Sequence, residues 1–276
     1  MKTFVKLTLL SLFLLAASAC GTDEQTAGTD AETDDSAEAG EAANEASSDE
    51  ETYTVATDNG FVPFEFVDEE TGDLVGFDID LITAISDEAG FAIEFETMDF
   101  DAIVAGVSSG RYDIGIAGMT ITEERKENID FSQPYYTSGL TVAVHVDNDE
   151  ITSIDDLDGK NVTTRTGSTS ERYLEQNTDA VIEAFPQITE AYQNVITGRA
   201  DATVYDIPNV QYYASTEGGE QLKVVGDPLT GEDYGIAFSK GSEIRNVADE
   251  ALTTLMENGT FGDIYEKWFG ERPDGM

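Results

Sequence analysis

Cysteine and histidine are almost absent from this chain, which holds one of each, Cys20 and His145. A single cysteine rules out a disulfide within one molecule, and the two residues together rule out zinc sites built from several Cys and His ligands. No nucleophile–base pair and no phosphate-cradling glycine loop is visible elsewhere in the sequence. We therefore expect no metal, no cofactor and no enzymatic activity.

Basic residues are also scarce, because 14 Lys and Arg face 57 Asp and Glu and the net charge is −43. Residues 21–51 hold 12 of the acids and no base, which leaves 45 acids and 12 bases from Thr52 onward. Such a field disfavours nucleic acid and anionic lipid surfaces as partners. Salt would screen its self-repulsion, so we expect a halophilic protein from a high-salt environment. Each Arg or Lys that faces a pocket becomes a candidate for binding.

The N-terminal segment has the pattern of a secretory signal. A basic start is followed by a largely apolar run of 13 residues, 7–19, which is too short to span a bilayer. Small residues lead directly into Cys20 and resemble a bacterial lipobox, with Ala17 where Leu is commoner. We expect a signal peptide at 1–19, a lipid such as palmitate on Cys20 and an acidic disordered linker at 20–51. The alternative is an ordinary cleavage site with a coincidental Cys.

From residue 53 onward, strand and helix patterns alternate, which indicates an α/β fold with largely parallel sheets in two similar halves. Ligands of such folds bind outside the carboxyl ends of the strands. We expect strands at 53–57, 91–95, 113–117, 139–144, 161–165, 180–184, 202–205, 222–225 and 234–238, and helices at 77–89, 100–107, 168–176, 188–197, 207–213, 242–258 and 261–269.

The most informative helix start is residues 118–125, Gly-Met-Thr-Ile-Thr-Glu-Glu-Arg. Thr120 and Thr122 are both good N-caps, and Thr120 with Glu123 fits a capping box. Arg125 opposes the helix dipole in a first turn, so it is suited to a bound carboxylate, which its planar fork and the free N–H groups could hold. The alternative is a solvated Arg at a strand–helix junction.

Two further helix starts follow predicted strands. Residues 165–171 contain Ser168 and Glu171 at capping-box spacing, and Asp206 is a candidate N-cap before Pro208. Taken singly, each is most simply a helix cap. Taken together, Arg125 with the amides of Ser168 and Thr169 could hold a carboxylate, and Asp206 could hold an ammonium, which describes a site for a zwitterion. Phe61 and Phe100 could supply its apolar walls.

Ordered motifs along the folded region resemble family 3 solute-binding proteins of polar amino-acid ABC transporters, and within that family the glutamine binders most of all. The resemblance covers about 220 residues and rests on these segments: 58–66 (DNGFVPFEF), 76–81 (GFDIDL), 98–100 (MDF), 117–125 (AGMTITEER), 129–136 (IDFSQPYY), 200–209 (ADATVYDIPN), 257–260 (ENGT) and 267–270 (KWFG). It implies a two-lobed periplasmic-binding-protein-like fold of type II, joined by two crossover hinge strands. The implied boundaries are 52–142 and 234–276 for lobe 1, and 143–233 for lobe 2.

The resemblance also implies roles for individual residues. Arg125, Thr120 and the Thr169 amide would bind the ligand carboxylate, Asp206 and the Gly118 carbonyl its ammonium, and Phe61 and Phe100 would enclose its side chain. Asp58 and Arg165 would meet the head group of that side chain. The glutamine binders have Lys where this chain has Arg165, and His where it has Tyr205, so donor geometry differs at the head group. Glutamine is favoured, while Asp58 could instead select a cationic side chain and Arg165 an acidic one.

The function implied is a lipid-anchored receptor on the outer face of the cell membrane, periplasmic in a Gram-negative cell. It would act as a monomer and deliver a free amino acid to ABC permease subunits. Two other classes stay open: a dehydratase, since some enzymes share this fold, and a sensor that depends on a partner protein.

Overall fold

The computed structural model describes residues 51–216 and 221–273, within one unit of the chain, Ser48–Met276. The signal peptide expected at 1–19, the lipid on Cys20 and nearly all of the linker at 20–51 lie outside the described residues. No helix in the described ranges is long and apolar enough to cross a membrane.

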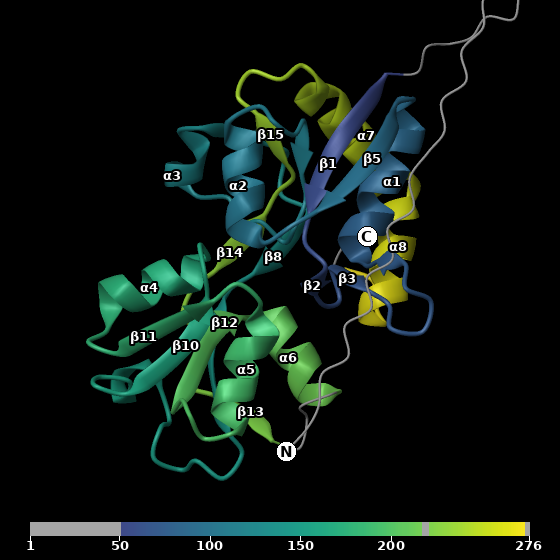
Figure 1. Cartoon of the computed structure of the whole chain (residues 1–276). Helices are drawn as coiled ribbons and strands as arrows, with labels where there is room; N and C mark the ends of the chain where they lie inside the picture. The colour runs from purple at the N-terminus through teal and green to yellow at the C-terminus, as the bar shows by residue number, and fades with distance from the viewer. Residues whose placement is uncertain (1–50, 217–220, 274–276) are drawn as a thin grey trace, which may run out of the picture. The chain divides into compact units, whose positions relative to one another are not determined.

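The first lobe is built on a five-stranded sheet with the order β5-β1-β6-β15-β7. The strands β5, β1 and β6 are parallel, and β15 runs antiparallel to both of its neighbours. Figure 1 shows this sheet with its helices. The elements of this lobe are β1 (Thr52–Thr57), α1 (Phe77–Ala89), β5 (Ala92–Thr97), α2 (Phe100–Ser108), β6 (Ile114–Gly115), α3 (Glu123–Lys126), β7 (Ile129–Phe131), β15 (Ala237–Ser239), α7 (Ile244–Asn258) and α8 (Thr260–Phe269).

The second lobe repeats this plan with the strand order β11-β10-β12-β9-β13. Here β11, β10 and β12 are parallel, and β9 runs antiparallel to both β12 and β13. The elements are β9 (Leu140–His145), the 3-10 helix η1 (Ile154–Asp156), β10 (Asn161–Arg165), α4 (Thr169–Asn177), β11 (Val181–Phe185), α5 (Ile188–Ile196), β12 (Ala202–Asp206), α6 (Ile207–Ser215) and β13 (Leu222–Val225).

Two short antiparallel strands connect the lobes. The strand β8 (Tyr136–Ser138) leads into β9, and β14 (Glu232–Tyr234) returns the chain to β15. We call this pair the crossover ribbon, which lies between the two sheets in Figure 1. A small sheet of β2 (Gly60–Phe61), β3 (Glu65–Val67) and β4 (Leu74–Val75) follows β1. The expected two-lobed α/β fold with two crossover strands is confirmed.

Two expectations about the strands are wrong, and both concern the places where the chain passes between the crossover ribbon and a sheet. The run 234–238 is not a single strand, because Tyr234 ends β14 in the crossover ribbon and Ala237 begins β15 in the first sheet. The sheets are also not largely parallel, because the strand that enters each sheet from the ribbon pairs antiparallel on both sides. The strand β9 spans the expected boundary at 142/143 and pairs entirely within the second sheet.

Aromatic rings fasten the crossover ribbon to the first lobe. The Tyr136 ring centroid lies 4.9 Å from that of Phe64, 5.6 Å from that of Tyr234 and 5.2 Å from that of Phe269 in α8. Such pairs contribute about 0.5–1.5 kcal/mol each beyond their buried area. This packing places the Tyr234 hydroxyl at the junction of the two lobes, where it meets Asp206.

Candidate functional site

Arg125 is a buried cation at the start of the site, with 5% of its surface exposed. Thr122, not Thr120, caps its helix, because the Arg125 N–H donates to the Thr122 hydroxyl at 3.1 Å. Thr120 instead forms a β-bridge with Tyr234 of the crossover ribbon. The capping box expected between Thr120 and Glu123 is therefore wrong, since that bridge keeps Thr120 extended and delays the helix by two residues.

The guanidinium of Arg125 has no carboxylate partner in the described part of the chain. Its two donors reach the carbonyl oxygens of Thr120 at 2.8 Å and Gly167 at 3.1 Å, and none of the ion pairs between described residues includes it. Its carbon lies 5.1 Å from the ring centroid of Phe100. Burial lowers the pKa of Arg125 to about 10, so the group stays charged at neutral pH. The charges of Asp206, Glu232 and Glu124 act on it without forming an ion pair, and a buried cation without an ion-pair partner is suited to an anionic ligand.

Asp206 is the corresponding buried anion, also 5% exposed. It ends β12 and stands at the N-cap of α6, but its side chain does not cap that helix. It accepts a hydrogen bond from the Tyr234 hydroxyl instead, and within the described ranges no cation forms an ion pair with it. Burial and then the charge of Glu232 raise the pKa of Asp206 to about 7. Asp206, the residue expected to accept the ligand ammonium, therefore does not use its carboxylate to cap α6.

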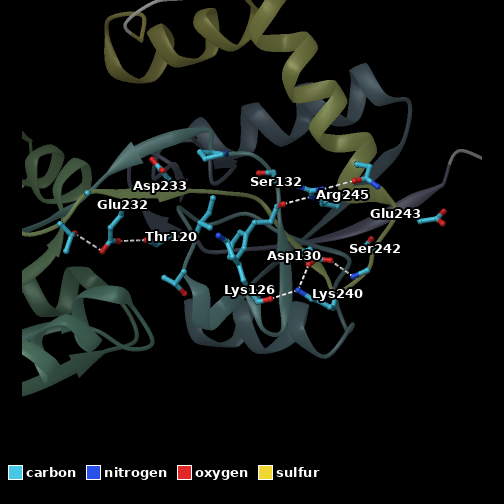
Figure 2. A pocket seen from close by; sticks show the side chains of 18 residues that line it. Thr120, Lys126, Asp130, Ser132, Glu232, Asp233, Lys240, Ser242, Glu243 and Arg245 are labelled. Atoms are coloured by element: carbon cyan, nitrogen blue, oxygen red, sulfur yellow. Dashed lines mark hydrogen bonds and ion pairs between the residues drawn. The ribbon is translucent and has the colours of Figure 1, made fainter.

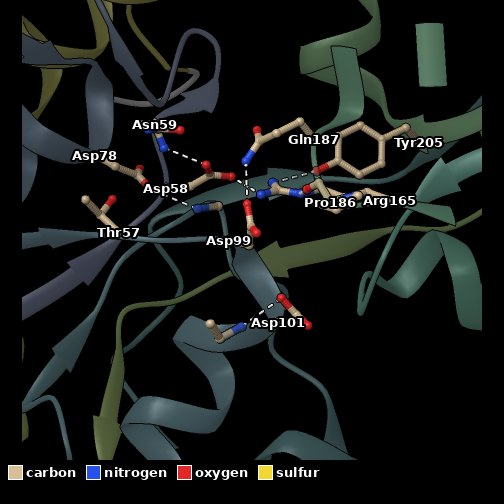
Figure 3. Close-up of polar contacts among 12 residues, drawn as sticks. Thr57, Asp58, Asn59, Asp78, Asp99, Asp101, Arg165, Pro186, Gln187 and Tyr205 are labelled. Carbon is tan, nitrogen blue, oxygen red and sulfur yellow. Dashed lines mark hydrogen bonds and ion pairs between the residues drawn. The ribbon is translucent and has the colours of Figure 1, made fainter. Parts of the chain in front are cut away.

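Asp58 and Arg165 form an ion pair between the lobes, drawn in Figure 3. Asp58 is 0% exposed and Arg165 is 1% exposed. The Arg165 guanidinium also donates to the Tyr205 hydroxyl at 3.3 Å and the Pro186 carbonyl at 3.1 Å, and lies 5.3 Å from the Phe100 ring centroid. Burial acts to lower the pKa of Arg165, but the Tyr205 and Asp58 oxygens outweigh it and the pKa is raised. The three residues expected at the side-chain head group lie together.

Gly118 and Phe61 are in contact. Gly118 has a φ of +51°, and a Cβ added to it would lie 2.3 Å from a ring carbon of Phe61. The Phe61 ring also packs against the ring of Tyr205, which is nearly perpendicular to it with 5.9 Å between centroids. Any side chain at 118 would therefore move the Phe61 wall, which explains why glycine occupies this turn.

Both the hydroxyl and the N–H of Ser168, which was expected to offer its amide to a ligand carboxylate, are used in hydrogen bonds within its own turn. Its hydroxyl accepts from the Glu171 N–H at 3.2 Å and donates to the Arg165 carbonyl at 2.6 Å, and its own N–H points to that same carbonyl at 3.4 Å. The Glu171 carboxylate accepts from Gly167 N–H at 2.7 Å, so only half of the expected capping box forms. Ser168 is engaged in shaping the turn before α4.

Glu232 was not anticipated from the sequence. From the crossover ribbon, its Oε2 accepts from the hydroxyls of Thr120 at 2.7 Å and Thr169 at 2.9 Å, one from each lobe. Thr230 donates to its Oε1 at 3.1 Å. The only sequence signal was an acid in the predicted return between the lobes. Glu232 thus joins the two threonines that were expected to serve a ligand carboxylate.

Further polar contacts cross between the lobes around the site. Arg172 in α4 pairs with Glu124 at 2.7 Å, Gln187 donates to Asp99 at 2.9 Å, and the Asn209 side chain donates to the Val62 carbonyl at 2.7 Å. With these contacts, every expected site residue is buried or half-buried, and the lobes meet over them.

A hollow of about 1000 Å³ adjoins the site, and Thr120 and Glu232 are among the residues that line it (Figure 2). It includes Lys126, Lys240 and Arg245, yet each is neutralised by a neighbour: Glu123 at 2.8 Å, Asp130 at 2.8 Å and Asp249 at 3.0 Å respectively. Neither Arg125 nor Asp206 lines it. No cluster of three His, Cys, Asp or Glu side chains suited to a metal ion occurs in the residues that the structure describes.

Comparison with known proteins gives a consistent family. Residues 53–271 match bacterial extracellular solute-binding proteins, family 3. The L-cystine-binding protein TcyA of Bacillus subtilis is 31% identical over 274 residues, covering 97% of this chain and 98% of that protein. An ancestral arginine-binding protein solved with arginine is 43% identical with a TM-score of 0.75, covering 79% of this chain and 98% of that one. An ancestral arginine-binding protein bound to glutamine is 44% identical with a TM-score of 0.74, covering 80% of this chain and 98% of that one.

Proposed function

The chain belongs to family 3 of the bacterial extracellular solute-binding proteins, which serve amino-acid ABC transporters, and we propose that it captures a free polar amino acid, with glutamine favoured, and delivers it to an ABC importer. One observation carries the proposal. Arg125 is a buried base and Asp206 a buried acid, and neither has an ion-pair partner in the described ranges. An α-amino acid carries the two complementary charges on one carbon.

We assign the shared part of the ligand to residues from both lobes. Arg125, Thr120 and the Thr169 amide would bind the carboxylate, while Asp206 and the Gly118 carbonyl would bind the ammonium. Because these groups come from α3, α4, β12 and the loop after β6, the ligand would bind between the lobes. Its charges would stabilise closure, which is how hinge proteins of this kind respond to ligand.

The side-chain subsite supports a carboxamide. Asp58 is a fixed acceptor and Arg165 a fixed donor, and an amide offers an acceptor and two donors to that pair at once. A cationic side chain would instead have to displace Arg165 from Asp58, which would leave a buried guanidinium without its partner. The ancestral protein solved with glutamine, at 44% identity, is consistent with this choice.

A cationic ligand is the alternative, and one contact favours it. The Arg165 guanidinium pairs with Asp58 while lying over the Phe100 ring, so these two side chains already accept a guanidinium. An arginine ligand could take that place if Arg165 swings away. The similarity to an arginine-bound structure at 43% identity fits this alternative.

A thermal-shift screen in high salt against the twenty amino acids and cystine tests the proposal. Glutamine should raise the melting temperature most, and arginine should do so if the alternative holds. If no amino acid shifts the melting temperature, the proposed receptor function is refuted. A catalytic role is not proposed, because the relatives compared above are named as binding proteins.

We also propose that a lipid on Cys20 holds the protein at the outer face of the membrane. The support is the small-residue run that ends at the chain's single cysteine. Cys20→Ser should release the protein from the membrane fraction into the medium or periplasm. Equal membrane retention of the variant and the wild type would argue for another mode of attachment.

A further inference from the structure

Two carboxyl groups lie behind the proposed ammonium subsite, in the core of the first lobe. Glu65 of β3 and Asp78 in the first turn of α1 are both 0% exposed. The Oδ2 of Asp78 accepts from the Gly118 N–H at 2.8 Å and from the Tyr135 hydroxyl at 2.9 Å. The Oδ1 of Asp78 and both Glu65 oxygens have no hydrogen-bond partner in the structure as described.

No cation neutralises either carboxyl among the ion pairs that the described residues form. The cation whose charge acts on Glu65 is Arg165, which is already paired with Asp58. Tyr135 and the Gly118 amide are neutral donors. Asp58 adds a further negative charge near Glu65. The pair is therefore surrounded by apolar groups, two neutral donors and one neutralised ion pair.

Two ionised carboxylates cannot be stable side by side in this environment. Each buried charge without a partner is strongly destabilising, and like charges repel more in a medium of low dielectric. One proton removes one of the charges and supplies a donor for the unpartnered Oδ1 of Asp78. Glu65 is the better place for it, because Asp78 has two donors that stabilise its anion and Glu65 has none.

The pKa directions agree with this assignment. Burial, followed by the charges of Asp78 and Asp58, raises the pKa of Glu65 well above its usual range. Burial also raises the pKa of Asp78, but the donors Gly118 and Tyr135, followed by the neighbouring Glu65 carboxyl, limit the value to about 6.

We propose that Glu65 and Asp78 form a carboxylic acid–carboxylate pair that holds one proton at neutral pH and anchors the backbone of Gly118. The anchoring matters because Gly118 contacts Phe61 so closely that its position sets that wall as well as its own carbonyl. Glu65 and Asp78 are thus positioning residues. The link to ligand ammonium rests on the proposed function, whereas the proton and the anchor do not.

The pH dependence of stability tests the shared proton. In the folded chain the pKa of Glu65 is raised well above its ordinary 4.5. At any pH between 4.5 and this raised pKa, the Glu65 carboxyl therefore holds a proton in the folded state that it has lost in the unfolded state. Wild-type stability is then lost as pH rises, up to about tenfold in the unfolding equilibrium per pH unit. Glu65→Gln keeps a donor and cannot titrate, so its slope should be smaller than that of the wild type, leaving below about pH 7 the contributions of Asp78 and Asp206, whose pKa values are also raised. Glu70→Gln, an exposed acid in the loop after β3, should follow the wild type.

Chemical denaturation of the three proteins from about pH 5 to about pH 8 measures this difference. Parallel pH profiles for Glu65→Gln and the wild type would overturn the shared proton. If Glu65→Gln does not fold, infrared spectroscopy of the wild type at neutral pH replaces it. The carbonyl band of a buried carboxylic acid, shifted in D₂O, is expected there, and its absence would overturn the proposal.

The Gly118 amide reports the anchor. Its ¹⁵N–¹H resonance in the wild type should move as Asp78 titrates near pH 6, while amides of exposed loops far from acids stay in place. A Gly118 resonance that does not respond between about pH 4 and about pH 8 would refute the anchoring. None of these measurements uses a ligand, so their outcome is separate from whether an amino acid binds.

Discussion

Replacing Arg125 by Ala should weaken the binding of every amino acid by a similar factor. The guanidinium is 5% exposed and, in the described residues, its donors reach only the carbonyl oxygens of Thr120 and Gly167. A ligand carboxylate would be its sole charged partner. Because all α-amino acids present that carboxylate, the loss should be independent of the ligand side chain.

The magnitude follows from the burial of the group. Truncating one partner of a buried, hydrogen-bonded charge pair costs about 2–5 kcal/mol, and every 1.4 kcal/mol is about tenfold in Kd. We therefore expect at least tenfold weaker binding. Lys126→Ala is the matched control, since it removes a positive charge from the next position of α3, where the side chain is 47% exposed and paired with Glu123 on the surface. Exposed pairs of that kind contribute about 0–1 kcal/mol.

Isothermal titration with two or three ligands of different side chains separates the outcomes. Arg125→Ala should lower all affinities together, and Lys126→Ala should leave them within about threefold. Melting curves without ligand should show that both variants are folded. Wild-type affinity in Arg125→Ala, or a loss confined to one ligand, would refute the assignment of Arg125 to the carboxylate.

Three other predictions concern Asp206, the head-group pair and salt. The pKa of Asp206 is raised to about 7 and its charged form is needed for the ammonium, so affinity should fall as pH drops below about 7, and titrations of Asp206→Asn should be weaker and lack this dependence. Arg165→Met should weaken glutamine and favour cationic amino acids by freeing Asp58, and a competition assay that finds the wild-type preference would contradict our reading of the subsite. The melting temperature should rise from low to molar NaCl, because 45 acids and 12 bases follow residue 51 and the Debye length falls to about 3 Å at 1 M; a flat salt profile would count against the halophilic expectation.

Local sequence signals predicted most of the elements. Helix α1 covers 77–89 as expected, because its apolar positions recur at helical spacing and Gly90 ends it in the left-handed conformation. Strands β10 and β13 likewise match, at 161–165 and 222–225. In these segments the pattern and the tertiary contacts favour the same structure, so local reasoning is sufficient.

Three of the misses depend on distant partners. Thr120 and Thr122 are equally good caps in the sequence, and a bridge to Tyr234 decides between them. Glu232 lies in an acidic segment whose sequence is typical of an exposed loop. It reaches the site only through hydrogen bonds with Thr120 and Thr169, which are 112 and 63 residues away in the sequence. The sequence also did not reveal the burial of Glu65. An acid between two phenylalanines predicts a solvent-facing position in a strand, whereas the Glu65 side chain is buried.

The crossover ribbon connects the two charge subsites more directly than either lobe does. From β14, the Tyr234 hydroxyl donates to Asp206 while Glu232 accepts from Thr120 and Thr169. A ligand bound to Arg125 and Asp206 together would therefore lie next to the residues that contact both ends of β14, a strand of three residues. The part of lobe closure that acts through the ribbon would then depend on groups that all amino acids share. Selectivity would depend on Asp58 and Arg165, which do not contact the ribbon in any hydrogen bond of the described residues. Because the Asp58–Arg165 ion pair also joins the lobes, a change of this pair should alter ligand preference and the strength of closure, while the contacts of the ribbon with Thr120, Thr169 and Asp206 are preserved.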